Sequence, residues 1–218
     1  MATSKLQRKV TKIDIALSKS FPNARVELDF ASPIELLVAT MLSAQSTDVK
    51  VNQVTKSLFI KYPTIKDYLR VSIDQFESDI RQIGLFRQKA KNIRAALVII
   101  QEKYESRVPS TIENLLSLPG VGRKSANVIL SNIFGIPGIV VDTHVGRVSR
   151  RLGLTNQDDP TKIEEELSNL LPPKKWTKFG QRIVLHGRYL CKAKKPVCEA
   201  CNIISHCISE EKNLNGVS

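Results

Sequence analysis

Residues 118–126 read LPGVGRKSA and form a short turn between two segments that have the apolar spacing of helices. Gly120 and Gly122 permit a left-handed backbone and leave room for another backbone to approach closely. The turn leads into a helix whose first N–H groups lack partners within the helix and therefore attract a phosphate. Basic Arg123 and Lys124 follow at once. This pattern predicts a helix-hairpin-helix that holds a DNA strand through backbone contacts, which position without reading sequence.

Two nucleotide-binding motifs do not fit this turn. A P-loop requires glycine at the positions of Leu118 and Arg123, and a dinucleotide-binding fingerprint requires a third glycine at Ser125 after a strand. The two glycines alone would also suit an ordinary helix–helix connection. The adjacent basic residues on a basic chain favour the DNA-binding interpretation.

The whole chain carries an excess of positive charge. It has 33 Lys and Arg against 21 Asp and Glu in 218 residues, a formal charge of +12. Such an excess favours polyanionic partners, because Lys and Arg release counterions from phosphate backbones. The N-terminus lacks the apolar core of a secretory signal, and the longest apolar stretches fall short of the ~20 residues of a membrane span. We therefore expect a cytoplasmic, nucleoid-associated protein with no membrane partner.

Apolar residues at helical spacing recur along nearly the whole chain. The stretch ELLVATMLSA, residues 35–44, is apolar on most sides, which indicates a central buried helix. Helix-starting patterns occur near Ser32, Thr47, Thr64, Phe86, Ser110, Asp142, Pro160 and Lys174. Convincing alternating strands with hairpin turns are absent. The sequence predicts an all-α fold.

Lys124 and Asp142 are the candidate catalytic residues, and each also has a plainer interpretation. The positive helix end and Arg123 both disfavour a protonated Lys124, and a neutral lysine is a Schiff-base nucleophile; a simple phosphate contact fits equally well. Asp142 follows the apolar run IVV at a good N-cap position, but its carboxylate would also suit a cationic transition state. His144 and Arg147, in the same segment, fit either a binding site or an ordinary surface.

All four cysteines lie near the C-terminus, at Cys191, Cys198, Cys201 and Cys207, with the spacing C-x6-C-x2-C-x5-C. In a reducing compartment disulfides are disfavoured, and clustered thiols more often hold a metal. Four thiolates bind either zinc or a [4Fe–4S] cluster. The residues alone leave these two alternatives even, with His206 as a substitute ligand for zinc.

Several motifs, in the same order along nearly the whole chain, resemble the endonuclease III family of DNA glycosylases. They are LLVATMLSAQSTD (36–48), IGLFRQKAKNI (83–93), LPGVGRKSANVIL (118–130), VDTHVGRVSRRLGL (141–154) and the cysteine spacing. The resemblance implies two helical domains. One is a six-helix barrel with the helix-hairpin-helix, residues 26–136. The other is a [4Fe–4S] cluster domain formed by both chain termini, residues 1–25 and 137–218, in which the four cysteines bind the cluster.

The resemblance also implies roles for individual residues. Lys124 matches the Schiff-base lysine of the family and Asp142 its essential aspartate. Gln45 matches a residue that fills the gap left by a flipped nucleotide, and Leu85 a wedge into the opposite strand. The expected DNA-contacting residues are Gln45, Leu85, Gly120, Val121, Gly122, Arg123, His144, Arg147, Lys192, Lys194 and Lys195. The family often has threonine at the position of Ser125. Serine keeps the hydroxyl group of that threonine.

The function implied is that of a bifunctional DNA glycosylase and apurinic/apyrimidinic lyase in base excision repair. A monomer would act on double-stranded DNA with damaged bases or abasic sites, remove oxidised pyrimidines, and nick by β-elimination through a lysine Schiff base. One alternative is a monofunctional mismatch glycosylase of the same fold, which Lys124 argues against. The other is a non-enzymatic DNA-binding iron–sulfur protein, which the joint presence of Lys124, Asp142 and Gln45 argues against.

Overall fold

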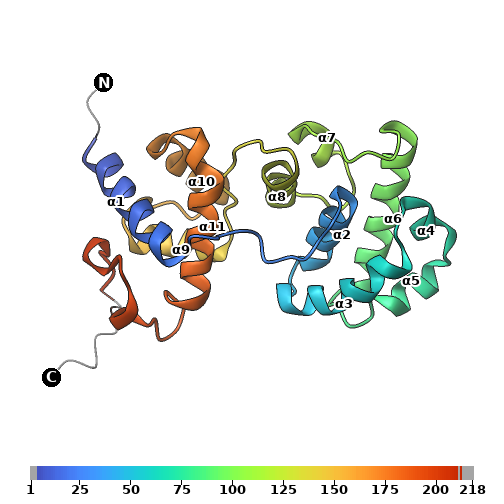
Figure 1. Cartoon of the computed structure of the whole chain (residues 1–218), viewed down its shortest axis with the longest axis horizontal. Helices are drawn as coiled ribbons and strands as arrows, with labels where there is room; N and C mark the ends of the chain where they lie inside the picture. The colour runs from blue at the N-terminus through green and yellow to red at the C-terminus, as the bar shows by residue number, and fades with distance from the viewer. Residues whose placement is uncertain (1–3, 211, 213–218) are drawn as a thin grey trace. The chain divides into compact units, whose positions relative to one another are not determined.

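The computed structural model describes residues 4–210 and 212, and over these residues it is entirely helical, without a strand. The elements are α1 (Lys5–Ser20), α2 (Pro33–Ser43), α3 (Asp48–Lys61), α4 (Ile65–Arg70), α5 (Ile73–Asp79), α6 (Phe86–Lys103), α7 (Ile112–Leu116), α8 (Arg123–Ile133), α9 (Thr143–Arg151), α10 (Pro160–Leu170), α11 (Pro173–Tyr189), and the 3-10 helices η1 (Cys198–Ala200) and η2 (Ile204–His206) (Figure 1). The all-α prediction is confirmed. None of the helices in the described part of the chain is long and apolar enough to cross a membrane.

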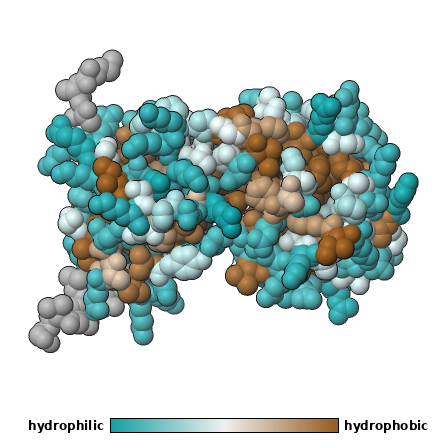
Figure 2. All heavy atoms as spheres, in the orientation of Figure 1, coloured by the Kyte–Doolittle hydropathy of each residue, from teal (hydrophilic) through white to brown (hydrophobic). Residues whose placement is uncertain are grey.

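The chain divides into two compact units. The hairpin unit is Glu27–Ile136, and the cysteine unit combines Met1–Val26 with Pro137–Ser218. The hairpin unit contains seven helices, α2 to α8, of which the five-residue α7 lies directly before the hairpin turn. On the face drawn in Figure 2, each unit shows many hydrophilic residues with hydrophobic patches among them.

The core of the hairpin unit is built around α2. Every residue from Leu36 to Leu42 is buried, as the apolar pattern on most sides of this segment predicts. Helices α3, α6 and α8 all pack against α2, and α6 also packs against α4 and α5. The helices that carry the hairpin and the segments on either side of Gln45 and Leu85 are therefore packed on one apolar core.

The core of the cysteine unit joins residues from both ends of the chain. Val10, Ile13 and Leu17 of α1 pack in one apolar cluster with α9, α10 and α11. A buried carboxylate adds a polar tie, because Asp14 on α1 accepts from Lys175 at 2.9 Å and from Arg182 at 2.7 Å. Removing either cation would leave a buried carboxylate less compensated, which is costly. The N-terminal helix is thus an integral part of this unit.

Candidate active site and cysteine pocket

The two hairpin glycines have different structural roles. Gly120 has φ +79°, and a Cβ there would lie 2.9 Å from the Cβ of Asn92 on α6. Gly122 has φ −95°, and a Cβ there would meet nothing within 4 Å. Val121 between them is buried, and its N–H donates to Leu118 at 3.1 Å. Only Gly120 therefore needs the left-handed backbone, whereas Gly122 leaves an open approach to the start of α8.

Helix α8 begins without a side-chain cap, because its N-cap residue is Gly122. The first N–H groups and the positive end of the helix dipole then attract an anion. Arg123 and Lys124 are the first two residues of the helix, and both are exposed. The arrangement places the exposed amine of Lys124 in the first turn of a helix whose free N–H groups can attract an anion.

Gln45 and Leu85 are two exposed residues of the hairpin unit with the same unusual backbone. Gln45 follows the end of α2 with φ 55°, and Leu85 is the N-cap of α6 with φ 58°. Leu85 is 62% exposed. A left-handed conformation at a residue other than glycine costs roughly 1–2 kcal/mol, so the surroundings must impose it. Both side chains are held outward at strained turns, where another molecule can contact them.

Asp142 is the N-cap of α9, which starts in the cysteine unit. Its Oδ1 accepts from the backbone N–H groups of His144 and Val145, both at 2.9 Å. Within residues 4–210 and 212, no hydrogen bond to its Oδ2 is found. Asp142 therefore caps α9, and the cap uses only one of its two carboxylate oxygens.

Arg147, one of the expected DNA contacts, directs its guanidinium into the cysteine unit. Its Nε donates to the carbonyl oxygen of Cys191 at 3.1 Å, and its Nη2 donates to that of Gly187 at 2.8 Å. Nη2 also lies 3.2 Å from Nδ1 of His144, which is half-buried. Burial lowers the pKa of Arg147, although the nearby Cys191 opposes this. The side chain ties α9 to the C-terminal end of α11.

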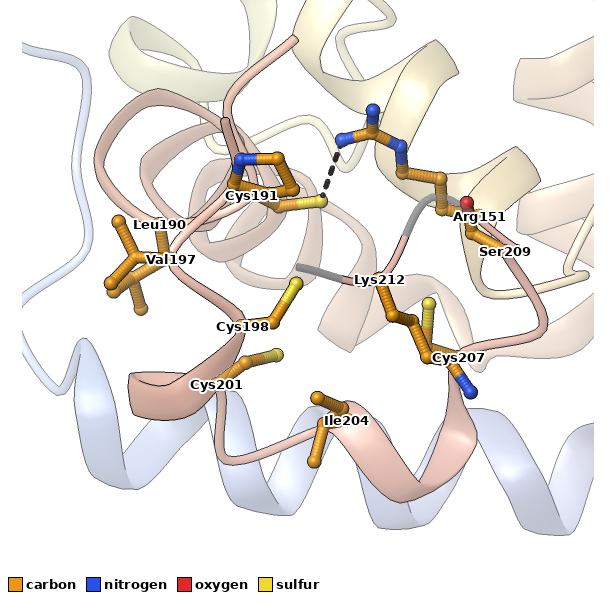
Figure 3. Close-up of a pocket in the computed structure, with 11 residues that line it drawn as sticks. Arg151, Leu190, Cys191, Val197, Cys198, Cys201, Ile204, Cys207, Ser209 and Lys212 are labelled. Carbon is orange, nitrogen blue, oxygen red and sulfur yellow. Dashed lines mark hydrogen bonds between the residues drawn. The ribbon is translucent and has the colours of Figure 1, made fainter. Parts of the chain in front are cut away.

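The four cysteines line one pocket in the cysteine unit (Figure 3). All four are free thiols, and all are partly buried. The other lining residues are mostly apolar, apart from Arg151, Ser209 and Lys212; they include Leu190, Pro196, Val197 and Ile204. In the described part of the chain, no three His, Cys, Asp or Glu side chains converge on a single-ion site. The thiols surround a shared apolar space.

Arg151 fixes the loop between the first two cysteines. Its Nη1 donates to Sγ of Cys191 at 3.4 Å (Figure 3) and to the carbonyl oxygen of Lys192 at 2.8 Å. Lys192, Lys194 and Lys195 are exposed on this loop. The loop therefore presents three cations to solvent while its backbone is held against α9.

Lys89 on α6 is not among the site residues that the sequence predicts. It is only 7% exposed, and its Nζ donates to the carbonyl oxygen of Leu42 at 2.8 Å and to Oγ of Ser46 at 3.2 Å. Its position in the sequence was the available signal, since Lys89 shares the apolar face of α6 with Ile93 and Ile100. A lysine on a core-facing stripe requires a specific partner.

Comparison with known proteins identifies the family. The HhH-GPD superfamily of base excision DNA repair proteins matches residues 38–173. Endonuclease III of Synechocystis sp. is 46% identical over 209 residues, which are 95% of each chain. The chain belongs to the endonuclease III family. Endonuclease III of Escherichia coli strain K12 is 40% identical, over 90% of this chain and 93% of that one.

Solved structures agree with membership of the endonuclease III family. A trapped endonuclease III–DNA covalent intermediate is 44% identical and superposes with a TM-score of 0.89, covering 95% of this chain and 97% of that chain. A thermostable thymine-DNA glycosylase, at 23% identity and a TM-score of 0.84, shares the fold. As an endonuclease III family member, the protein is a base excision DNA repair enzyme. The predictions of family and fold class are confirmed.

Proposed function

We propose that this protein is a monomeric DNA glycosylase and abasic-site lyase that removes oxidised pyrimidines from double-stranded DNA in the cytoplasm. The observation that carries the proposal is the exposed Lys124 at the uncapped start of α8, directly after the hairpin. A relative that is 44% identical over nearly the whole chain forms a covalent intermediate with DNA. An exposed lysine beside a phosphate-binding helix end suits such an intermediate.

The hairpin holds the damaged strand. Phosphate binds at the backbone N–H groups of the α8 start, and the open space at Gly122 lets the strand approach closely. Arg123 and the exposed lysines of the loop after Cys191 add positive charge. We leave Arg147 out of the direct contacts, because its guanidinium already binds carbonyl groups of its own unit.

Lys124 and Asp142 carry out the reaction in this proposal. As the damaged base leaves, Nζ of Lys124 attacks C1′, so that a bond from carbon to the lysine replaces the bond to the base. The carboxylate of Asp142 stabilises the positive charge that develops on the sugar and helps to move protons. Ring opening gives a Schiff base that acidifies the C2′ proton. Loss of that proton breaks the C3′–O bond by β-elimination and nicks the strand.

Gln45 and Leu85 hold the duplex open while the damaged nucleotide is extruded. An amide at Gln45 can pair with an orphaned base, and an aliphatic wedge at Leu85 can unstack a base step. The strained, outward conformation of both residues supports these roles. Leu85 would otherwise be expected in an apolar core.

Cys191, Cys198, Cys201 and Cys207 hold a [4Fe–4S] cluster in this proposal. The donor set fits, because four free thiols line one pocket whose other walls are mostly apolar, as a buried cluster requires. The cluster would supply covalent cross-links that fold the C-terminal segment. Arg151 would hold the basic loop beside it, and the reaction at the sugar would stay with the side chains.

Trapping with borohydride tests the catalytic lysine. Wild-type protein should be reduced onto DNA that contains an abasic site, and Lys124→Gln should abolish both trapping and nicking while DNA binding is largely kept. Lys103→Gln, which removes an exposed lysine from the far end of α6, serves as the control and should behave as wild type. Trapping by Lys124→Gln at the wild-type level would overturn the assignment.

Iron and sulfide analysis tests the cluster. Anaerobically purified protein should be brown and contain about four irons and four sulfides per chain. Cys198→Ser should lose iron, whereas His206→Ala should keep it, because the histidine is a ligand only in the zinc alternative. Stoichiometric zinc in a colourless, active protein would refute the cluster.

A further inference from the structure

The residues around Gln45 and Leu85 must hold two strained turns in place. Both residues are exposed and left-handed, and neither has an intrinsic preference for that conformation. Their positions are far apart in the sequence, so separate local turns cannot fix the distance between them. A physical link between the two turns is needed if both are to enter one duplex together.

Lys89 contacts both turns, one through its backbone and the other through its side chain. Its backbone N–H donates to the carbonyl oxygen of Leu85 at 3.0 Å, in the first turn of α6. Its side chain reaches the other turn, where Nζ donates to Leu42 at 2.8 Å and to Ser46 at 3.2 Å. These two partners lie on either side of Gln45 in the chain. The backbone bond is the ordinary bond of an α-helix, so it is the side chain of Lys89 that ties the start of α6 to the residues on both sides of Gln45.

The burial of Lys89 indicates a specific role. The ammonium group sits at the C-terminal end of α2, where carbonyl groups lack helical partners and the dipole is negative. Burial lowers the pKa of Lys89, so the site disfavours the charge that these carbonyl groups attract. An apolar residue would fill a core position without this conflict. A second link, from Lys50 on α3 to Gln82, joins the segment after Gln45 to the segment before Leu85 near the surface.

We propose that Lys89 is a positioning residue that holds Gln45 and Leu85 as one rigid pair, so that both enter a damaged duplex in a single step. The inference rests on the insertion roles proposed above. Without the Lys89 ammonium, each turn would keep its own residues and its packing on the core, but would lose the buried polar contact that ties it to the other turn. Removing the ammonium should weaken binding to a duplex that is opened at a lesion, and should leave binding to an intact duplex unchanged.

The test uses Lys89→Met, which keeps the apolar stem and removes the donor. Lys91→Met is the matched control, since Lys91 is exposed two residues further along the same helix. The probe is a duplex with a tetrahydrofuran abasic analogue opposite 2-aminopurine, whose fluorescence reports unstacking. A matched duplex without the analogue reports binding to an intact backbone. Thermal unfolding of each variant is measured in parallel.

For Lys89→Met we expect the preference for the abasic duplex over the intact duplex to fall about tenfold, with a smaller fluorescence change. Affinity for the intact duplex should stay within about twofold, because phosphate contacts at the hairpin are unchanged. Lys91→Met should match wild type. If Lys89→Met keeps the wild-type preference and fluorescence, the inference is wrong. Should this variant not fold, Ser46→Ala removes one partner and should weaken the preference in the same direction by about twofold.

A double-mutant cycle separates positioning from general structure. In a background of Gln45→Ala with Leu85→Ala, Lys89→Met should cause no further loss, because the residues that it positions are gone. An equal loss in both backgrounds would show a purely structural lysine and overturn the inference. If Gln45→Ala and Leu85→Ala themselves leave the preference unchanged, the proposed insertion roles are wrong. That result does not depend on the Lys89 variant, so the two failures can be told apart.

Discussion

Helices α8 and α9 start in opposite ways, one in each unit. Helix α8 of the hairpin unit begins at Gly122 with no side-chain cap and two cations in its first turn. Helix α9 of the cysteine unit begins at Asp142, whose carboxylate occupies the N–H groups that α8 leaves open. The first helix start attracts a phosphate, and the second repels one and favours a cation. The same structural element thus leaves open N–H groups in one unit and a capping carboxylate in the other, which suits the separate roles proposed for them.

Each unit holds some basic residues internally and leaves others exposed. In the hairpin unit Arg123 and Lys124 are exposed, whereas Lys89 donates to a carbonyl group. In the cysteine unit, Arg147 and Arg151 donate to carbonyl groups, and Arg182 donates to a buried carboxylate. Part of the net charge of +12 therefore stabilises the fold and is not available to DNA. Net charge identifies the class of partner but not the residues that bind it.

Asp142→Asn should give the largest effect and tests the contrast between the two helix starts. Asparagine keeps an acceptor for the cap, so the thermal midpoint should move by only about 1 °C, while base excision should fall by ~10²–10³. Asp159→Asn is the matched control, because Asp159 caps α10 through the same pair of contacts, at 3.0 Å each. Full activity of Asp142→Asn would show that the aspartate is a cap and nothing more.

Arg147→Ala and Arg123→Ala test the contrast between internal and exposed cations. Arg147→Ala should destabilise the protein by about 2–3 kcal/mol, because buried carbonyl groups lose a charged donor, and should leave the salt dependence of DNA binding unchanged. Arg123→Ala should change stability by only ~0.5 kcal/mol and reduce the salt slope by ~1. Urea unfolding and binding titrations at several salt concentrations measure both. If Arg147→Ala reduces the salt dependence of DNA binding and leaves stability intact, Arg147 contacts DNA directly.

Gly120→Ala and Gly122→Ala separate the glycine that the fold requires from the glycine proposed to lie against DNA. Alanine at 120 must adopt φ +79° and meets Asn92 at 2.9 Å, so it should cost about 1–2 kcal/mol of stability. Alanine at 122 has open space in the free protein, so stability should hold while affinity for DNA falls. Unfolding and DNA titration of the same preparations check this. Equal DNA affinity for Gly122→Ala and wild type would contradict the proposal that the DNA strand lies close to Gly122.

The sequence predicts most helix boundaries because their signals are local. Asp142 is the N-cap of α9 as expected, and α6 begins at Phe86 as expected. The start near Ser110 was wrong by one residue. Thr111 is the N-cap of α7, and it accepts from the N–H of Asn114 at 3.3 Å. Two adjacent hydroxyl residues suit a cap equally, and only packing decides between them.

The candidate site depends on contacts that local sequence cannot specify. The cysteine spacing indicates a shared ligand, and the structure brings the four thiols to one pocket. The direction of Arg147 is different, because its partners Gly187 and Cys191 lie 40 and 44 residues away. The left-handed turns at Gln45 and Leu85 oppose local preference, so contacts from elsewhere in the fold must impose them.

The smallest expected effect concerns Asp79, which ties α5 to α3 in the hairpin unit without touching the site. Its carboxylate accepts from Lys61 at 2.6 Å, from the hydroxyl of Tyr62, and from Gln75 at 2.9 Å. Burial raises the pKa of Asp79, but these donors outweigh burial and hold it below the usual 3.8. The stabilisation is therefore complete above pH 3.8 and is lost as the pH falls through the lower pKa of the folded state. Asp79→Asn should cost less than about 1 kcal/mol, equally at pH 5 and pH 8, as measured by hydrogen exchange in α3 and α5. If the loss of stability in Asp79→Asn differs between pH 5 and pH 8, a group other than Asp79 controls the contact.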